Sequence, residues 1–97
     1  MAIKVIVELH AKPGMRAQLR SLLDSMVEEH GPNQRGFLGS ARYEVLDNAD
    51  MLVEIADWES TEARLAHMEE SAATGAYAPL MEMLAAPFRA TVLKQLP

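Results

Sequence analysis

The sequence contains no cysteine among its 97 residues. This absence excludes a disulfide framework and a thiolate metal site. The three histidines, His10, His30 and His67, show no metal-ligand spacing, although folding could still gather ligands from distant positions. No G-x-S-x-G motif and no glycine-rich phosphate loop occurs. We therefore expect no metal site.

Basic clusters and long apolar runs are also missing. Asp and Glu outnumber Lys and Arg by 14 to 9, which gives a net charge of -5. An acidic chain repels phosphate backbones, and no Lys/Arg cluster is present to attract anionic lipid, so we expect neither nucleic-acid nor membrane binding. No apolar run is long enough to span a bilayer, and residues 1–5 lack the layout of a signal peptide. We expect a soluble cytoplasmic protein.

The length and the apolar content together indicate one folded domain that spans residues 1–97. Hydrophobic residues make up 49% of the chain, which argues against disorder. A domain of this size buries only roughly two-thirds of the surface of its unfolded chain. Help from a partner chain would therefore stabilise it.

Apolar periodicity predicts seven elements in the order β-α-β-β-α-α-β. Strands are expected over residues 2–10, 37–46, 51–58 and 88–96. Helices are expected over residues 15–29, 60–70 and 76–86. Gly31 and Pro32 are expected to end the first helix, and Ser71 to Gly75 to form a break. This order matches the ferredoxin-like, split βαβ plan, an α+β fold whose four-stranded antiparallel sheet carries helices on one face.

The second face of this sheet is expected to be apolar as well. Four residues are assigned to it: Ile6, Leu38, Leu46 and Leu52. Such a face needs cover, and a second copy of the chain is the economical one. We predict a homodimer, with the last strand reaching toward the partner.

The stretch from Trp58 to His67 is the most informative part of the chain. Trp58 ends a predicted strand, and Ser60 has the character of a helix N-cap. His67 then lies roughly two turns along the helix. An indole and an imidazole are thereby placed at the mouth of one strand–helix layer. This arrangement suits the wall of a site for a planar ligand, and it equally suits an ordinary core corner.

Several short motifs resemble the antibiotic biosynthesis monooxygenase family, whose members form dimeric α+β barrels. They are Lys12-Pro13-Gly14, Gly36-Phe37-Leu38-Gly39, Trp58-Glu59-Ser60 with Ala63 and His67, and Tyr77. The resemblance implies a homodimer with a pocket between sheet and helices in each subunit. It also implies oxidation of phenols or quinols by molecular oxygen without a metal, flavin or other cofactor.

The chain departs from relatives in this family at two positions. Haem-degrading members carry an Asn on the first strand, where this sequence has Val7, so haem degradation is not expected. The family often carries a Glu two residues before the Trp, where this sequence has Ala56 and a displaced Glu54. The resemblance therefore leaves the chemistry of the pocket undecided.

The candidate catalytic residues are His67 and Trp58. With a reference pKa of about 6.5, a histidine suits the removal of a proton from a phenol at neutral pH. His67 could equally be a helix histidine bonded to a neighbouring carbonyl. Trp58 could stack on an aromatic substrate, and it could also be a packed core indole; both can hold at once.

The candidate substrate-binding residues are Tyr77, Tyr43 and Met81. The two tyrosines could hydrogen-bond a quinone oxygen, although Tyr43 alternates with charged neighbours and could face either way. Met81 could line an adaptable pocket, with ordinary core filling as the alternative. Arg42 could pair with an anionic intermediate, but a salt bridge to Glu44 or Glu54 is favoured.

We expect a cofactor-independent monooxygenase that oxidises a phenolic, quinol or polycyclic aromatic small molecule with O2. The alternative is a non-catalytic dimer that binds a small hydrophobic ligand. A third hypothesis is a structural dimer with a filled core, against which a cavity lined by Trp58, His67 and Tyr77 would count.

Overall fold

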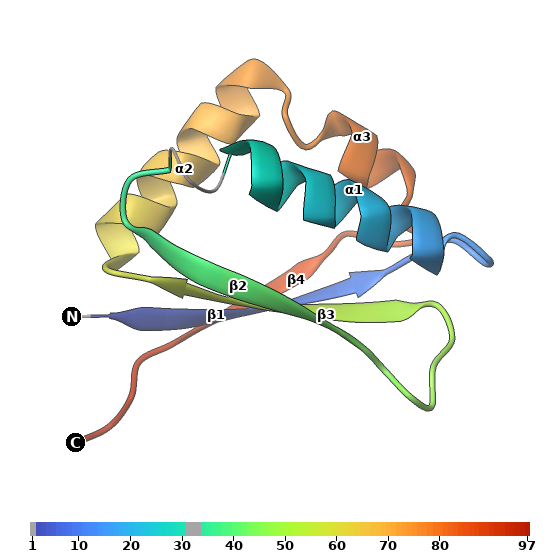
Figure 1. Ribbon diagram of the computed structural model, residues 1–97, viewed down its shortest axis with the longest axis horizontal. Coiled ribbons are helices and arrows are strands. Elements are labelled where there is room, and N and C mark those ends of the chain that lie inside the picture. The colour runs from blue at the N-terminus through green and yellow to red at the C-terminus, as the bar shows by residue number, and fades with distance from the viewer. Residues whose placement is uncertain (1, 31–33) are drawn as a thin grey trace.

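The computed structural model describes residues 2–30 and 34–97 and contains the seven elements in the predicted order. The strands are β1 (Ile3–His10), β2 (Phe37–Glu44), β3 (Met51–Trp58) and β4 (Arg89–Leu93). The helices are α1 (Arg16–His30), α2 (Thr61–Thr74) and α3 (Ala78–Glu82). The strands form one antiparallel sheet in the order β2-β3-β1-β4, and the three helices cover one of its faces (Figure 1). The predicted α+β, ferredoxin-like fold is confirmed.

The hydrophobic core lies between the sheet and the helices, in two clusters. One cluster gathers Leu9, Ala11, Leu19, Leu23, Leu52, Leu80 and Leu84 beneath α1 and α3. The other gathers Ile3, Val5, Ala56 and Trp58 near the opposite end of β1 and β3. Val7 packs against both clusters, so the middle of β1 connects them.

The second and third helices differ from their predicted bounds. α2 continues to Thr74 because Ser71, assigned to a break, is buried inside the helix. Gly75 ends it in the left-handed conformation with φ 69°, which a glycine adopts without steric cost. α3 is shorter than the expected 76–86, with Pro79 in its first turn. The predicted cap at Gly31 and Pro32 lies outside the described residues.

Two residues assigned to the second sheet face lie elsewhere. Leu52 is buried in the core, because it pairs with Leu9 of β1 and directly opposed residues point to the same face. Leu46 lies beyond the end of β2 in the hairpin loop, where it is 94% exposed. The second face is nevertheless rich in apolar side chains. Ile6 of β1 pairs with Ile55 of β3, which in turn pairs with Ala41 of β2.

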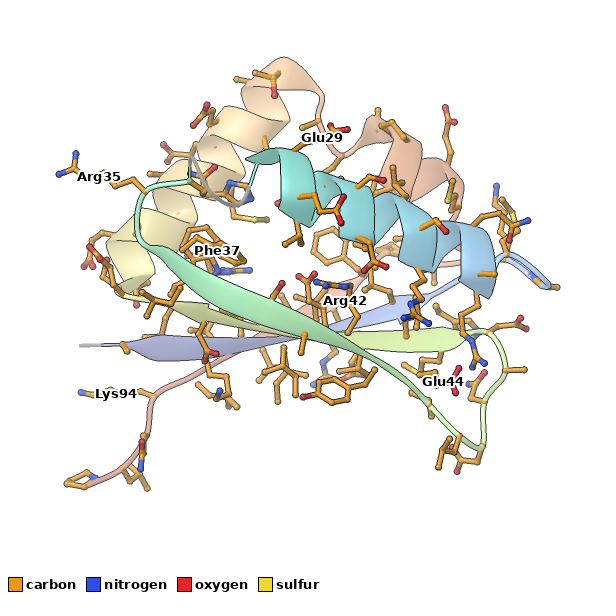
Figure 2. All side chains as sticks on the ribbon, viewed as in Figure 1. Glu29, Arg35, Phe37, Arg42, Glu44 and Lys94 are labelled. Carbon is orange, nitrogen blue, oxygen red and sulfur yellow. The ribbon has the colours of Figure 1, made fainter. Side chains whose placement is uncertain are left out.

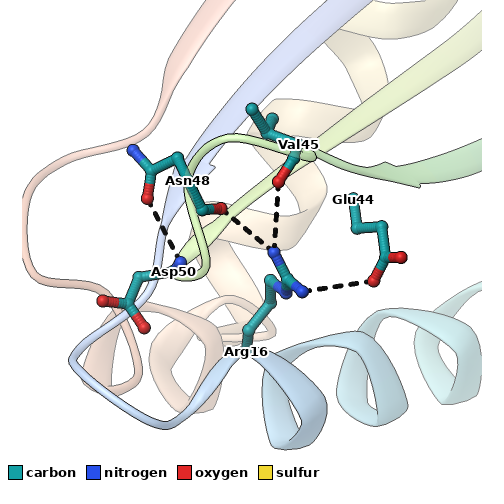
Figure 3. Close-up of polar contacts among 5 residues, drawn as sticks. All are labelled: Arg16, Glu44, Val45, Asn48 and Asp50. Atoms are coloured by element: carbon teal, nitrogen blue, oxygen red, sulfur yellow. Dashed lines mark hydrogen bonds and ion pairs between the residues drawn. The ribbon is translucent and has the colours of Figure 1, made fainter.

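The hairpin between β2 and β3 is fastened to the start of α1 by Arg16. Its guanidinium donates hydrogen bonds to the backbone carbonyls of Val45 at 3.4 Å and Asn48 at 3.0 Å. It also forms an ion pair with Glu44 at 3.2 Å, as Figure 3 shows. Each of the two carbonyls also accepts a backbone N–H within the hairpin, Val45 from Asn48 and Asn48 from Met51, so Arg16 adds a second hydrogen bond to each. One side chain thereby ties the helix layer to the sheet layer.

No helix among residues 2–30 and 34–97 is long and apolar enough to cross a membrane.

Candidate functional site

A cavity of about 360 Å³ lies between the helix-facing side of the sheet and the three helices. Its walls are mostly apolar and come from strands and helices alike. They include Val5, Val7 and Ala56 of the sheet and Leu23, Met26 and Val27 of α1. The volume falls in the lower part of the range of about 300–1,000 Å³ that small-molecule sites occupy. A cavity of about 150 Å³ can hold one benzene, so this one is large enough for more than one ring.

Aromatic rings and one imidazole form a continuous row along this cavity. The Trp58 ring lies 5.2 Å from that of Phe37 on β2 and 5.2 Å from the His67 imidazole on α2. Tyr77 continues the row, with ring distances of 6.2 Å to His67 and 6.4 Å to Phe88. These side chains come from the start of β2, the end of β3, the middle of α2 and the positions just before α3 and β4, and they meet at one wall. Figure 2 shows Phe37 pointing from β2 toward α2.

The start of α2 explains why Trp58 and His67 meet. The Ser60 hydroxyl accepts a hydrogen bond from the Ala63 N–H at 3.1 Å, which confirms the predicted N-cap. The Glu59 N–H donates to the Gly36 carbonyl at 2.8 Å. Gly36 has φ 82°, and a Cβ there would lie 2.5 Å from the Ala63 methyl. Only glycine allows the chain at the start of β2 to approach α2 this closely. This contact holds the first turn of α2 beside the start of β2.

A hydrogen bond joins His67 and Tyr77 at the cavity wall. The Tyr77 hydroxyl oxygen lies 3.0 Å from Nε2 of His67 and 3.6 Å from the sulfur of Met68. The donor in the first contact depends on the histidine tautomer. A Tyr77 hydroxyl that donates to Nε2 requires the other ring nitrogen to carry the imidazole proton. The pair is thereby arranged to pass a proton.

The environment keeps the Tyr77 phenol protonated. Burial raises its pKa above the ordinary value of 10.0, and the negative charge of Glu54 adds to this effect. A hydrogen bond with Ser71 and the positive charge of Arg64 act in the opposite direction. At neutral pH Tyr77 is therefore a neutral hydroxyl that donates and accepts hydrogen bonds, and it is no base of its own.

Glu54 is a cavity residue that the sequence reasoning did not identify. It lies on the helix-facing side of β3, where its neighbours in register are Val7 of β1 and Arg42 of β2. Burial raises the pKa of its carboxyl above 4.5, and the Arg42 charge opposes that shift. The signal was present in the sequence, since Leu52, Glu54, Ala56 and Trp58 occupy alternate positions of one strand.

The structure brings three of the five predicted site residues together: Trp58, His67 and Tyr77 all line the cavity. Tyr43 does not reach it, because its partner in register is Val53 and it is 53% exposed on the opposite sheet face. Met81 also lies outside the lining and is 44% exposed, since its neighbour Leu80 takes the inward position of α3. The expected placement of Tyr43 and Met81 in the pocket is thus corrected.

Val7 and Ala56, the two positions where the sequence departs from the pattern of the family it resembles, both line the cavity. Their apolar side chains leave Glu54 as the acidic group that β3 contributes to it. The described residues contain no group of three or more His, Asp or Glu side chains placed to hold a metal ion.

An antiparallel sheet with helices on one face and a cavity between the layers defines the class of ferredoxin-like α+β domains with an internal ligand-sized pocket. Within this class, the chain belongs to the antibiotic biosynthesis monooxygenase family, whose model matches residues 2–78. No curated protein sequence matches the chain.

Solved structures match over nearly the whole length. The chain is similar to Rv0793 of Mycobacterium tuberculosis, with 28% identity, a TM-score of 0.81 and coverage of 100% of this chain and 97% of that one. It resembles a conserved protein of Methanosarcina mazei with 20% identity, a TM-score of 0.84 and coverage of 99% and 94%. It also resembles a mutant of SnoaB, a cofactor-independent oxygenase of Streptomyces nogalater, with 14% identity, a TM-score of 0.81 and coverage of 97% and 92%.

Proposed function

We propose that this protein is a cofactor-independent monooxygenase that oxidises a phenolic, quinol or polycyclic aromatic small molecule with O2. The observation that carries the proposal is the 3.0 Å contact between His67 and Tyr77 on the wall of a mostly apolar, aromatic-lined cavity. Membership of the antibiotic biosynthesis monooxygenase family supports it, and so does the likeness to the oxygenase SnoaB.

The first step is removal of a proton from the bound substrate. The substrate hydroxyl, or an acidic C–H beside a ring carbonyl, gives its proton to the Tyr77 oxygen while the Tyr77 proton passes to Nε2 of His67. A histidine accepts a proton near neutral pH, whereas the raised pKa of Tyr77 makes it a relay. The resulting carbanion or phenolate is electron-rich enough to reduce O2.

The oxidation needs no electrons from the protein. For a ring CH2 group that becomes a carbonyl, the carbon gives four electrons to one O2 molecule. One oxygen atom becomes the carbonyl oxygen, and the other leaves as water with the two hydrogens. The protein contributes proton transfer, orientation and exclusion of water. Trp58, which is 5% exposed, would hold the ring plane.

Oxygen uptake with anthrone tests the proposal, because anthrone carries one such CH2 group between two fused aromatic rings. We expect uptake of one O2 per anthrone, with formation of anthraquinone, and a loss of about a hundredfold or more in His67→Ala. Protein dialysed against a chelator should act equally well. Wild-type protein that consumes no oxygen with anthrone or any electron-rich hydroquinone would leave the proposal without support.

Wild type and His67→Ala together also decide whether the protein is a binding module instead. Its cavity could hold a hydrophobic ligand without chemistry, and binding alone requires no proton acceptor. A His67→Ala protein that binds anthrone as tightly as wild type, together with a wild type that turns nothing over, would favour the non-catalytic module.

We also propose a homodimer through the sheet face that the helices leave uncovered. Apolar side chains support it, above all the opposed pair Ile6 and Ile55 at the centre of the sheet. Light scattering at micromolar concentration should give twice the mass of the chain, and Ile55→Lys should give a monomer. Leu65→Lys on the exposed side of α2 is the control and should remain dimeric. A wild-type monomer at this concentration would sink the dimer.

A further inference from the structure

Glu54 places a carboxyl group on the wall of a mostly apolar cavity. Its side chain is only 19% exposed, and its neighbours in register are Val7 and Arg42. The proposed proton transfer uses His67 and Tyr77 and leaves Glu54 without a role. A buried carboxyl is costly, so its presence in a ligand-sized cavity calls for a reason.

Arg42 neutralises Glu54 only in part. Its Nε atom lies 2.5 Å from Asp24 of α1, whereas its NH1 atom lies 3.7 Å from Glu54. The same NH1 atom donates a hydrogen bond to the Ser40 hydroxyl at 2.9 Å. In Figure 2 the Arg42 side chain lies between β2 and α1. Two carboxylates thus share one guanidinium, and the shorter contact goes to Asp24.

The remaining acceptor capacity of Glu54 is available to the cavity. An ionised carboxylate offers about four lone-pair sites, and Arg42, which acts on Glu54 through its charge and a hydrogen bond, occupies only part of this capacity. Glu54 also acts on Tyr77 through its charge, so both residues belong to one electrostatic environment. Along β3, Glu54 lies four residues from Trp58, which corresponds to about 13 Å of strand. This span exceeds the length of a single aromatic ring.

We propose that Glu54 is a specificity-determining residue that selects aromatic ligands with a hydroxyl donor at the end remote from Trp58 and rejects ligands with a carboxylate there. A hydroxyl donates a charge-assisted hydrogen bond to Glu54, which is stronger than a neutral one. A second carboxylate in the same mostly apolar cavity faces like-charge repulsion and loses its water. Asp24 and Ser40 hold the Arg42 guanidinium, which keeps Arg42 from pairing fully with Glu54. The inference rests on the proposed function only in requiring that the cavity binds an aromatic substrate.

Three naphthalenes with the same 2,6 substitution separate the contributions of donor and charge. They are 2,6-dihydroxynaphthalene, 2,6-dimethoxynaphthalene and naphthalene-2,6-dicarboxylate, and their symmetry prevents a flipped pose from hiding the effect. Trp58 is the sole tryptophan of the chain and lines the cavity, so quenching of its fluorescence reports binding. Wild-type protein should bind the dihydroxy compound about tenfold more tightly than the dimethoxy compound and at least that much more tightly than the dicarboxylate.

Glu54→Gln keeps the shape and an acceptor oxygen and removes the charge. It should bind the dicarboxylate about tenfold more tightly than wild type does and the dihydroxy compound about fivefold more weakly, because a charge-assisted hydrogen bond becomes a neutral one. Glu69→Gln is the matched control, because Glu69 is exposed on α2 between two residues of the cavity wall without being part of it. It should leave all three affinities unchanged.

Two results would overturn the inference without any variant: wild-type affinities within threefold of one another, or no quenching by any of the three probes. A folded Glu54→Gln protein with wild-type selectivity would overturn it too. These measurements are made without oxygen. Selective binding without oxygen uptake would therefore refute the monooxygenase and retain the role of Glu54, and oxygen uptake without selectivity would do the reverse.

Discussion

The Tyr77 hydroxyl oxygen lies 3.0 Å from Nε2 of His67, although ten residues separate them in the sequence. The turn at Gly75 makes this contact possible. α2 ends there, and the Ala76 N–H donates to the Ser71 carbonyl at 3.0 Å, so the chain folds back over the helix. Tyr77 therefore returns to the helix turn that carries His67.

Replacement of Tyr77 by Phe should isolate the function of this hydroxyl. The ring and its packing against Phe88 remain, while the proton relay to His67 is lost. We expect kcat for anthrone oxidation to fall by about a hundredfold, with little change in thermal stability. Tyr43→Phe is the control, since Tyr43 lies on the other sheet face. Unchanged kcat in Tyr77→Phe would remove the relay from the mechanism.

Substitutions of Trp58 and His67 should affect different properties: the first mainly the stability of the fold, the second mainly turnover. Trp58 is buried in a core cluster, so Trp58→Ala should lower the free energy of unfolding by about 3–5 kcal/mol. His67→Ala leaves a half-buried helix site and should cost far less stability while abolishing most turnover. Thermal melts and oxygen uptake on both variants check this. A stable His67→Ala protein with wild-type turnover would contradict the assignment.

Arg16 and Arg20 offer a matched pair for the connection between helix and hairpin. Arg16→Ala removes hydrogen bonds to two loop carbonyls and should cost about 1–2 kcal/mol. Arg20 makes an exposed ion pair with Asp24 at 3.7 Å, so Arg20→Ala should stay within about 0.5 kcal/mol of wild type. Urea unfolding measures both. Equal losses of unfolding free energy in the two variants would show that the contacts of Arg16 to the hairpin stabilise the fold no more than an exposed ion pair does.

The sequence allowed the fold to be predicted where local patterns decide the structure. Aliphatic alternation in residues 2–10 and the apolar stripe of residues 15–29 fix one inward face each. The N-cap of α2 could be predicted at Ser60, because a hydroxyl at that position accepts a hydrogen bond from a free N–H of the first turn. Ser71 was assigned to a break on its propensity, but burial beside Tyr77 keeps it helical.

The faces of β2 and β3 could not be assigned from the sequence, because pairing sets them. Residues 51–55 are apolar on both faces except at Glu54, so alternation does not show which way Leu52 points. Its pairing with Leu9 settles the question. Tyr43 is placed by the same register, opposite Val53. Glu54 was missed for a related reason: its partner Arg42 comes from another strand, and the cavity exists only once the helices are packed.

The raised pKa of Glu54 predicts how stability depends on pH. The folded protein binds this proton more tightly than the unfolded chain, whose carboxyl has the ordinary value of 4.5. The contribution of Glu54 to the free energy of unfolding is therefore fully present below about pH 4.5 and is lost as the pH rises through the raised pKa. Gln at this position does not titrate. Stability of Glu54→Gln relative to wild type should thus increase from pH 4 to pH 7.

Urea unfolding of both proteins at pH 4, 5, 6 and 7 and constant ionic strength measures this difference. Other carboxyl groups titrate in both proteins, so their contributions cancel in the comparison. Glu69→Gln, which removes an exposed carboxyl from α2, should follow the wild-type pH dependence. Parallel curves for Glu54→Gln and wild type would mean that the Arg42 charge fully offsets the burial of Glu54.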